Sequence, residues 1–334
     1  MTYCAAPFVH MVHNPDGQYR TCCMFDKPLE GEYRNVQEAF DSEENKVIRK
    51  RMLSGEILPE CIKCDLDEEH RRKMVVSYRG QFNERWPKPD GKIRSLEIST
   101  SNICNFRCLT CSEHFSNQFG KTIKNELPDP KVYEHLEHLK ILGGEPFLDK
   151  RNYEILEQAP RSQCELQIVT NGSIYPPENI VKLLHEFKKT TINVSIDGIG
   201  EVGEWVRPGM KWKRVERNFR KWKEQRDYPF FNVHPHFVFH ALNAPYFEDF
   251  LAWARMPIQW FSWDLLVSPK YLNISYLPDH IKEYIIDKNP TLRETLETFM
   301  AKNEYSERNF YKLVKIASIA PDIMEDYIEK FFER

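Results

Sequence analysis

The chain has 334 residues, 41% of them hydrophobic, which is enough for one large α/β domain and a smaller module. Its formal net charge of -3 gives no overall electrostatic reason to expect a nucleic acid or an anionic membrane as a partner. No stretch approaches the roughly 18 consecutive apolar residues of a membrane span, and the N-terminus lacks a basic region followed by an apolar run. We therefore expect a cytoplasmic protein with no membrane contact and no nucleic-acid partner.

Cysteine is used in clusters. In a reducing compartment, nine cysteines are not expected to form a disulfide framework, and clustered thiols there usually bind metal. Seven of the nine fall into three groups, and two stand alone. The groups are Cys22 with Cys23, Cys61 with Cys64, and Cys104 with Cys108 and Cys111; Cys4 and Cys164 are the isolated ones. We interpret Cys164 as a plain buried thiol.

Residues 1–90 have the pattern of a small, irregular, cysteine-rich module. Residues 7–12 and 18–25 are predicted to form a hairpin, because Pro15 and Gly17 between them supply the backbone conformations of a tight reversal. Helices are predicted over residues 35–53 and 65–83. The run from Trp86 to Gly91 contains two prolines and a glycine, so we place a domain boundary near residue 90.

From residue 91 to 270, strands alternate with helices, which is the pattern of a parallel sheet covered by helices. Six strands suit an α/β fold that forms an open, partial (β/α)6 barrel of the TIM type rather than a closed one of eight. Residues 271–334 read as a helical C-terminal extension. The predicted strands are Ile93–Ser99, His138–Leu142, Glu165–Thr170, Thr191–Ile196, Asn232–Phe239 and Trp260–Val267, with helices such as Pro177–Lys188 and Lys211–Gln225 between them.

Two predicted elements in this region, one helix and one strand, carry polar residues that could bind a ligand. Lys211–Gln225 is basic, with Trp212, Val215, Phe219 and Trp222 at helical spacing. A nucleic acid or an acidic peptide could bind there, but we interpret the stripe as the buried face of an outer helix. In the fifth predicted strand His234, His236 and His240 share one face, where a substrate-contacting role competes with that of a polar lining.

The strongest chemical signal is C-x3-C-x2-C, formed by Cys104, Cys108 and Cys111. It directly follows the first predicted barrel strand, and in strand–helix barrels the loops after the strands form the active site. Three thiolates can hold three irons of a [4Fe-4S] cluster and leave the fourth iron open for a small chelating ligand. A structural zinc site is the alternative for this spacing alone.

This loop resembles the hallmark of the radical S-adenosylmethionine (SAM) superfamily, in both spacing and place. The resemblance extends to Gly143, Gly144, Glu145 and Pro146 after the second strand, which are similar to the family's GGEP loop. It implies that the glycines let the backbone approach SAM and that the glutamate accepts hydrogen bonds from the SAM amino group. One departure is Thr110, where the family often has an aromatic residue before the last cysteine. The alternative for the GGEP-like loop is a helix-entry turn with an acidic first residue.

The resemblance implies further SAM contacts at the ends of later strands. These are Asn171, Ser195, Asp197 and Arg207. Ser195 and Asp197 share one strand face and would hydrogen-bond a ribose together, and Arg207 would pair with the SAM carboxylate. Turn chemistry or a surface charge would explain each of these residues singly.

A second metal site is predicted in the N-terminal module, from Cys4, Cys22, Cys61 and Cys64. The spacing C-x12-G-x4-C with a later C-x2-C resembles the auxiliary-cluster module called SPASM or, in its short form, twitch. It departs from most relatives because it precedes the barrel. Four thiolates could hold an auxiliary iron–sulfur cluster or zinc. Cys23 is the alternative to Cys22, because neighbours in a strand point to opposite faces.

The resemblance implies an enzyme that reductively cleaves SAM at its [4Fe-4S] cluster to a 5′-deoxyadenosyl radical, which abstracts hydrogen from an unidentified substrate. The substrate would be a peptide or protein, or a small molecule. A one-electron reductant such as flavodoxin or ferredoxin would be needed. The alternatives are a non-catalytic iron–sulfur electron carrier or redox sensor, and a zinc-stabilised binding module.

Overall fold

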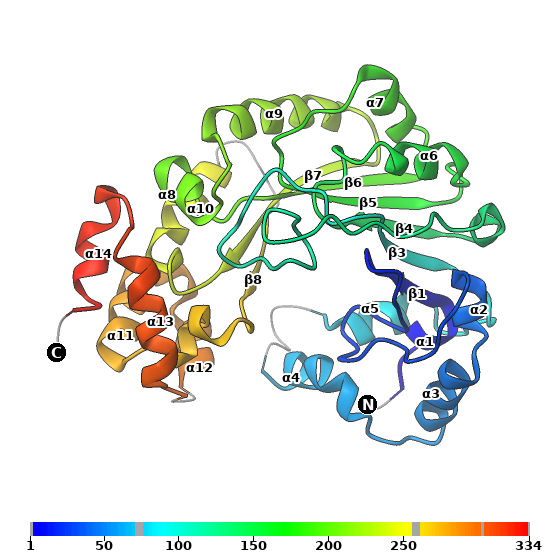
Figure 1. The fold of residues 1–334 in the computed structure, drawn as a ribbon, viewed down its shortest axis with the longest axis horizontal. Coiled ribbons are helices and arrows are strands. Elements are labelled where there is room, and N and C mark those ends of the chain that lie inside the picture. The colour runs from blue at the N-terminus through cyan, green and yellow to red at the C-terminus, as the bar shows by residue number, and fades with distance from the viewer. Residues whose placement is uncertain (1–2, 71–75, 256–260, 302–303, 333–334) are drawn as a thin grey trace.

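The computed structural model describes residues 3–70, 76–255, 261–301 and 304–332. One eight-stranded sheet runs through it in the order β2-β1-β3-β4-β5-β6-β7-β8 (Figure 1). All neighbours are parallel except β1 and β2, which form an antiparallel hairpin. The strands are β1 (His10–His13), β2 (Tyr19–Arg20), β3 (Ser95–Ser99), β4 (His138–Leu142), β5 (Glu165–Thr170), β6 (Lys189–Ser195), β7 (Phe231–Phe239) and β8 (Ser262–Leu265).

The six strands predicted from the alternating pattern are all present, and β4 and β5 have the predicted bounds. The other four begin and end within two residues of the prediction, except that Trp260 lies outside the described residues. The sheet is open, which confirms the partial barrel. It is wider than predicted because β1 pairs in parallel with β3, so that the N-terminal hairpin extends the sheet by two strands.

The N-terminal segment contains the predicted hairpin, but its first residues differ from the prediction. Residues 6–9 form the short helix α1 (Ala6–Val9), where Pro7 occupies an initial helical position and pre-sets its backbone angle. Each of the two predicted helices is divided in two, and residues 71–75 lie outside the description. The helices are α2 (Val36–Phe40), α3 (Glu43–Leu53), α4 (Ile62–His70) and α5 (Tyr78–Arg85), with the 3-10 helix η1 (Pro59–Cys61) before α4.

The two faces of the sheet differ in chemistry. On one face, apolar rows such as Leu96, Leu139 and Leu166 lie side by side across β3, β4 and β5. The helices α6 (Arg151–Gln158), α7 (Glu178–Leu184) and α9 (Trp212–Glu224) lie along this face (Figure 1). The opposite, inner face presents polar rows such as Glu97, Lys140 and Gln167. Burial of the apolar rows fixes the register, so the polar rows must point inward.

The remaining helices are α8 (Gly200–Val206), α10 (Phe247–Arg255), α11 (Asp279–Lys288), α12 (Arg293–Met300), α13 (Glu307–Ala317) and α14 (Glu325–Glu329), and α11 to α14 gather at the β8 end of the molecule (Figure 1). Of these, α8 follows β6, α10 follows β7 and the others follow β8. Within the ranges that the structure describes, no helix is both long enough and apolar enough to cross a membrane.

Candidate functional site

Cys104, Cys108 and Cys111 lie on the loop that leaves β3 at the carboxyl edge of the sheet. Asn102, which is fully buried, organises this loop: its side-chain amide donates to the carbonyls of Glu113 and Lys121, and its side-chain oxygen accepts the Ile123 N–H at 2.8 Å. The loop is therefore folded back on itself around one asparagine. Sequence reasoning missed Asn102, because a lone asparagine before a cysteine carries no pattern.

Hydrogen-bond donors surround two of the three sulfur atoms. The backbone N–H of Phe106 donates to Cys104 Sγ at 3.4 Å, and Asn171 Nδ2 lies 3.8 Å from the same sulfur. Arg207 Nη1 lies 3.8 Å from Cys108 Sγ. Burial raises the pKa of Cys108 to about 12, and Arg207 opposes that rise. Such donors stabilise a thiolate, which is the form that binds iron.

The GGEP-like loop packs directly on the cysteine loop. Gly144 N–H donates to the Ser101 carbonyl at 3.1 Å, and Glu145 N–H donates to the Ile103 carbonyl at 2.7 Å. A Cβ atom on Gly143 would lie 2.7 Å from the Ser101 carbonyl oxygen, and one on Gly144 would clash with the Ile103 carbonyl. In this structure the glycines therefore allow the backbone to approach the cysteine loop.

Glu145 is 1% exposed, and its carboxylate accepts three hydrogen bonds. These come from Thr170 Oγ1 at 2.7 Å, the Asn171 N–H at 2.7 Å and the Phe147 N–H at 3.2 Å. Burial raises the pKa of Glu145 to about 7 in spite of these donors. Within the described part of the chain it forms no ion pair, so it is suited to a ligand that brings a positive charge, such as an amino group.

The other predicted SAM contacts lie at the same edge of the sheet, but two of them contact each other. Asp197 Oδ2 accepts two hydrogen bonds from Arg207, both at 2.8 Å, and Oδ1 accepts the Val238 N–H at 2.9 Å. Both carboxylate oxygens of Asp197 are thus occupied, and Arg207 is held in place beside Cys108. Ser195, at the end of β6, is half-buried and lies opposite His236 of β7 in register.

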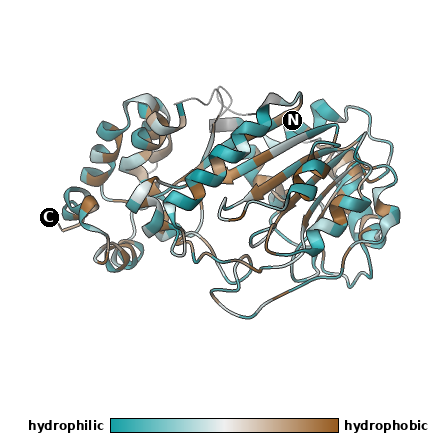
Figure 2. Cartoon of the chain, turned by 90° about the horizontal axis from the view of Figure 1, so that it is seen from above, coloured by the Kyte–Doolittle hydropathy of each residue, from teal (hydrophilic) through white to brown (hydrophobic). Residues whose placement is uncertain are grey.

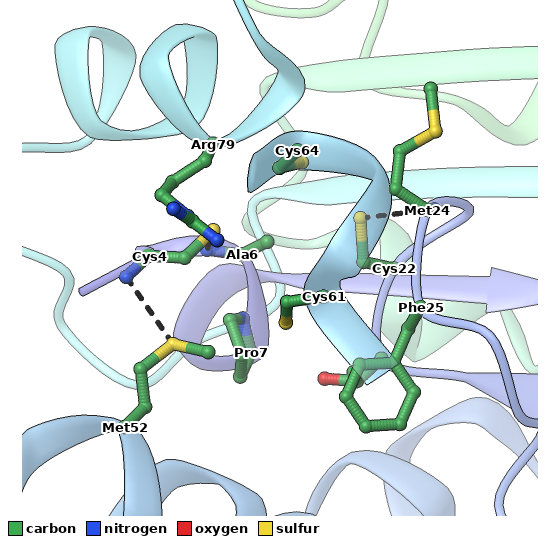
Figure 3. A pocket seen from close by; sticks show the side chains of 11 residues that line it. Cys4, Ala6, Pro7, Cys22, Met24, Phe25, Met52, Cys61, Cys64 and Arg79 are labelled. Atoms are coloured by element: carbon green, nitrogen blue, oxygen red, sulfur yellow. Dashed lines mark hydrogen bonds between the residues drawn. The ribbon is translucent and has the colours of Figure 1, made fainter. Parts of the chain in front are cut away.

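The four cysteines of the predicted second site line one cavity in the N-terminal segment (Figure 3). Cys4 precedes α1, Cys22 follows β2, Cys61 ends η1, and Cys64 lies in the first turn of α4. The rest of the lining is mainly apolar and includes Ala6, Pro7, Met24, Phe25 and Met52, with Thr21 and Arg79. Because Cys61 and Cys64 lie on one continuous segment, three segments of chain contribute thiols to this cavity.

Cys22 is the member of its pair that faces this cavity. Both cysteines lie just past the end of β2, so a turn rather than strand alternation separates them. Cys23 does not line the cavity; its thiol interacts with that of Cys22, and Glu97 and Lys140 of the sheet act on it electrostatically. On the inner face, Lys140 Nζ lies 2.9 Å from Glu97 Oε2 and 3.2 Å from the Tyr78 hydroxyl.

The cavity is also lined by hydrogen-bond donors and by the charged side chain of an arginine. The N–H groups of Ala6 and Met24 donate to Cys4 Sγ and Cys22 Sγ at 3.4 and 3.5 Å. Arg79, whose side chain is 5% exposed, binds Asp65 at 2.7 Å and Glu68 at 3.1 Å. Burial raises the pKa of Cys4 to about 12, and the Arg79 charge opposes this rise. Sequence reasoning missed the place of Arg79 in this cavity, because no local pattern links residue 79 to the cysteines.

In neither place do the thiols converge on one point: among the described residues, no three His, Cys, Asp or Glu side chains are grouped so that they could hold a metal ion. Cys164 is fully buried as predicted. The inward alternation of β7 is also confirmed, with His234 and His236 half-exposed and Val233 and Phe237 buried. His240 lies beyond the strand and is completely buried.

The open parallel sheet, with a three-cysteine loop after β3 and a glycine–glutamate loop after β4, defines an α/β protein of the partial-barrel type with three thiols on one loop at its carboxyl edge. Residues 98–254 match the family model described as "Radical SAM superfamily". These residues form a radical SAM domain.

Curated relatives share part of this sequence. A "Probable GTP 3',8-cyclase" of Methanocaldococcus jannaschii is 27% identical over 204 residues, which cover 58% of this chain and 67% of that protein. A "GTP 3',8-cyclase" of Staphylococcus epidermidis is 33% identical over 120 residues, which cover 32% of this chain and 35% of that protein. The chain thus spans between about a third and two thirds of these relatives.

Among solved structures, "Native anSMEcpe with bound AdoMet" aligns with 66% of each chain at 20% identity and a TM-score of 0.46.

Proposed function

We propose that this chain is a radical SAM enzyme in which Cys104, Cys108 and Cys111 bind a [4Fe-4S] cluster with one open iron for SAM. When both are bound, reductive cleavage of SAM supplies a 5′-deoxyadenosyl radical that abstracts a hydrogen atom from the substrate. The observation that carries the proposal is the loop after β3, which holds three thiols in one segment, two of which accept N–H donors: Cys104 from Phe106 and Cys108 from Arg207.

The chain's own residues would hold SAM around this loop. Glu145 would accept the amino group, since its buried carboxylate forms no ion pair within the described residues. Arg207, held by Asp197, would offer a guanidinium edge to the SAM carboxylate, as the family likeness implies. We assign Asp197 to orienting Arg207 rather than to the ribose. Gly143, Gly144 and Pro146 would shape the loop, and Asn171 and Ser195 would contribute polar contacts.

For the second site we propose an auxiliary iron–sulfur cluster on Cys4, Cys22, Cys61 and Cys64. A cluster contacts each thiolate through a different iron, so its ligands need not converge on one ion. The N–H donors from Ala6 and Met24 and the cation of Arg79 would stabilise the thiolates. Zinc is the alternative, and metal analysis separates the two.

The second site adjoins the inner face of the sheet through α5. Arg79 lines the cysteine cavity, and Tyr78, the residue before it, contacts Lys140 of β4. We propose that the substrate lies on this inner face, between the two sites. The face presents Gln167, Asn193 and His236, so a polar substrate fits it better than an apolar one.

The substrate itself is proposed only as a class: a peptide or protein, or a polar small molecule. We also propose the division into residues 1–90 as the auxiliary module, 91–270 as the radical SAM core and 271–334 as the extension, with β1 and β2 of the first part built into the sheet of the second. A cytoplasmic location stays a prediction from the sequence.

The test is SAM cleavage by the anaerobically purified protein after its clusters are reconstituted. With SAM and dithionite we expect 5′-deoxyadenosine to form, and Cys104→Ala/Cys108→Ala/Cys111→Ala to abolish it. Cys164→Ala is the matched control, because this buried thiol lies outside both sites. A preparation with intact clusters that forms no 5′-deoxyadenosine would favour an electron carrier or redox sensor. Zinc in place of iron and sulfide would favour the binding module.

A further inference from the structure

The helix α9 (Trp212–Glu224) has one face that packs against the rest of the protein and an opposite face whose composition packing does not explain. Val215, Asn218, Phe219 and Trp222 are buried against the sheet, as the sequence predicted. The opposite face is strongly basic and exposed. Its cations are Lys213, Arg214, Arg217, Arg220 and Lys221, which we call the α9 basic face. Figure 2, which looks onto the layer that contains α9, shows hydrophilic colour along this helix.

The charge on this helix is poorly compensated. Residues 211–226 hold eight Lys or Arg and two Glu, although the whole chain has a net charge of -3. In the described part of the chain, Lys213, Arg214 and Arg217 form no ion pair, whereas Arg220 binds Glu216 at 2.8 Å. Cations three or four residues apart on a helix repel each other. Burial, followed by Arg226 and Arg220, lowers the pKa of Lys223.

The first turn of α9 adds to this electrostatic cost. It contains no acidic residue, Lys211 precedes it without a side-chain cap, and Lys213 and Arg214 follow. Cations at a helix N-terminus oppose the helix dipole. The carboxylate of Glu204 accepts the Trp212 N–H at 2.7 Å and offsets part of the cost. A face that served only solvation would be more stable with charges of both signs.

The segment that leads into α9 contacts the proposed radical SAM site. The Pro208 carbonyl accepts the Arg107 N–H at 2.7 Å, and the Val206 carbonyl accepts the Leu109 N–H at 3.0 Å. Lys213 follows Pro208 by five residues, so their Cα atoms lie within roughly 18 Å of each other. Arg107, between the first two cysteines, is itself exposed and basic.

The middle of the helix is tied to the site as well. Asn218 Nδ2 donates to the carbonyls of Gly172 and Ser173, both at 3.0 Å, in the loop that carries Asn171. The basic surface is therefore rigidly attached to the loops around Cys104, Cys108 and Cys111.

We propose that the α9 basic face docks an acidic electron-carrier protein that delivers the electron for SAM cleavage. This rests on the proposed function, because only a cluster that must be reduced from outside needs such a partner. In the step, the carrier loses one electron and the cluster gains it, with no proton or group transferred. Opposite charges guide such encounters and raise their rate, and the short route from the helix to the cysteine loop suits electron transfer from a protein docked there.

The experiment compares two reductants on the reconstituted protein. Reduced flavodoxin must dock to deliver its electron, whereas dithionite is a small ion that needs no docking surface. The variant Arg214→Glu/Arg217→Glu reverses the charge at the centre of the face. Arg308→Glu/Lys315→Glu on α13 makes the same change in charge elsewhere on the surface. None of these residues lies in the cysteine or SAM-binding loops.

We expect the flavodoxin-driven rate of 5′-deoxyadenosine formation to fall about tenfold or more in the α9 variant, and the dithionite-driven rate to stay within about twofold of the wild type. The α13 variant should keep both rates. For the wild type, raising the salt from about 0.01 to about 0.15 M shortens the Debye length from about 30 to about 8 Å and should slow only the flavodoxin-driven reaction.

Two outcomes overturn the inference. An unchanged flavodoxin-driven rate in the α9 variant would mean that the carrier docks elsewhere. The α9 basic face would then be a binding site for another anion, such as an acidic peptide or RNA. An equal loss with both reductants would mean that the face supports the site or the fold instead. Failure of the wild type with dithionite is a different result, because it would contradict the proposed function.

Discussion

The two cysteine sites are assembled in opposite ways. Cys104, Cys108 and Cys111 come from one loop of the chain, whereas Cys4, Cys22 and the pair Cys61 and Cys64 are drawn from three segments. The first site lies at the carboxyl edge of the sheet, among loops that follow four strands. The second is a cavity that is lined mainly by apolar residues of the N-terminal segment. In the proposed enzyme, this difference would suit the first site to exchange ligands and the second to retain a metal.

The two sites also obtain positive charge differently. Arg79 lines the N-terminal cavity and is paired with Asp65 and Glu68. At the other site, Arg207 is already paired with Asp197, while the Glu145 carboxylate is buried without an ion-pair partner among the described residues. In the N-terminal cavity the cation already has its carboxylate partners, whereas at the other site the carboxylate of Glu145 would be paired by a ligand with an amino group.

The largest effect should come from Gly144→Ala, because its Cβ would clash with the Ile103 carbonyl and force the two loops apart. We expect SAM cleavage to be lost and the free energy of unfolding of the apo protein to fall by about 2 to 3 kcal/mol. Gly120→Ala is the control, since its Cβ would meet only the Glu113 side chain, at 3.2 Å. Dithionite-driven 5′-deoxyadenosine and urea titrations measure both effects. Wild-type values for Gly144→Ala would show that the contact is not needed.

A second prediction separates the two metal sites. Cys22→Ala should reduce the iron content from about eight to about four atoms per chain, because Cys22 lines the cavity. Cys23→Ala should leave it unchanged, since Cys23 does not line the cavity. Iron and sulfide analysis of the reconstituted variants decides between them. A reversed result would make Cys23 the ligand.

The carboxylate of Glu145, which forms no ion pair within the described residues, predicts that the stability of the apo protein depends on pH. The pKa of Glu145 is raised to about 7 from an ordinary value of 4.5, so the folded protein holds the proton more tightly than the unfolded chain does. Stability should therefore fall as the pH rises from about 4.5 to about 7, by about 3 kcal/mol from this group alone. In Glu145→Gln this part of the pH dependence should be missing. Parallel curves for the two proteins in urea titrations at several pH values would refute the assignment.

The smallest effect is expected at Arg79. Arg79→Met would leave Asp65 and Glu68 without their cation, at a cost of about 1 to 2 kcal/mol, because both carboxylates are partly exposed and screened by solvent. Arg79→Lys keeps the charge and should lose less. The midpoint of urea unfolding of the apo protein measures the difference. If both variants unfold like the wild type, the Arg79 cluster adds nothing to stability.

The contrast between the sites also explains what the sequence could predict. The cysteine loop and the strands before it are local patterns, so the six strands and the place of Cys104, Cys108 and Cys111 after the first could be predicted from spacing and periodicity. The pairing of β1 with β3 could not, because four residues joined to a partner some 85 positions away leave no local signal.

The sequence also could not predict which side chains contact each other. The polar residues at the strand ends pointed to Asp197 and Arg207, but not to their contact with each other. The choice of Cys22 over Cys23 depends on a turn after β2, and strand alternation alone left it open. The two glycines after β4 were assigned to SAM by likeness, whereas the nearest atoms to their missing side chains belong to the cysteine loop.

The central claim is that the loop after β3 supports SAM cleavage independently of the N-terminal cavity. The most direct measurement is 5′-deoxyadenosine formation with dithionite in two variants, Cys104→Ala/Cys108→Ala/Cys111→Ala and Cys61→Ala/Cys64→Ala. We predict no product from the first and continued SAM cleavage by the second, with its remaining iron at the loop site. Product from the first variant, or none from a second variant that retains the loop cluster, would contradict the claim.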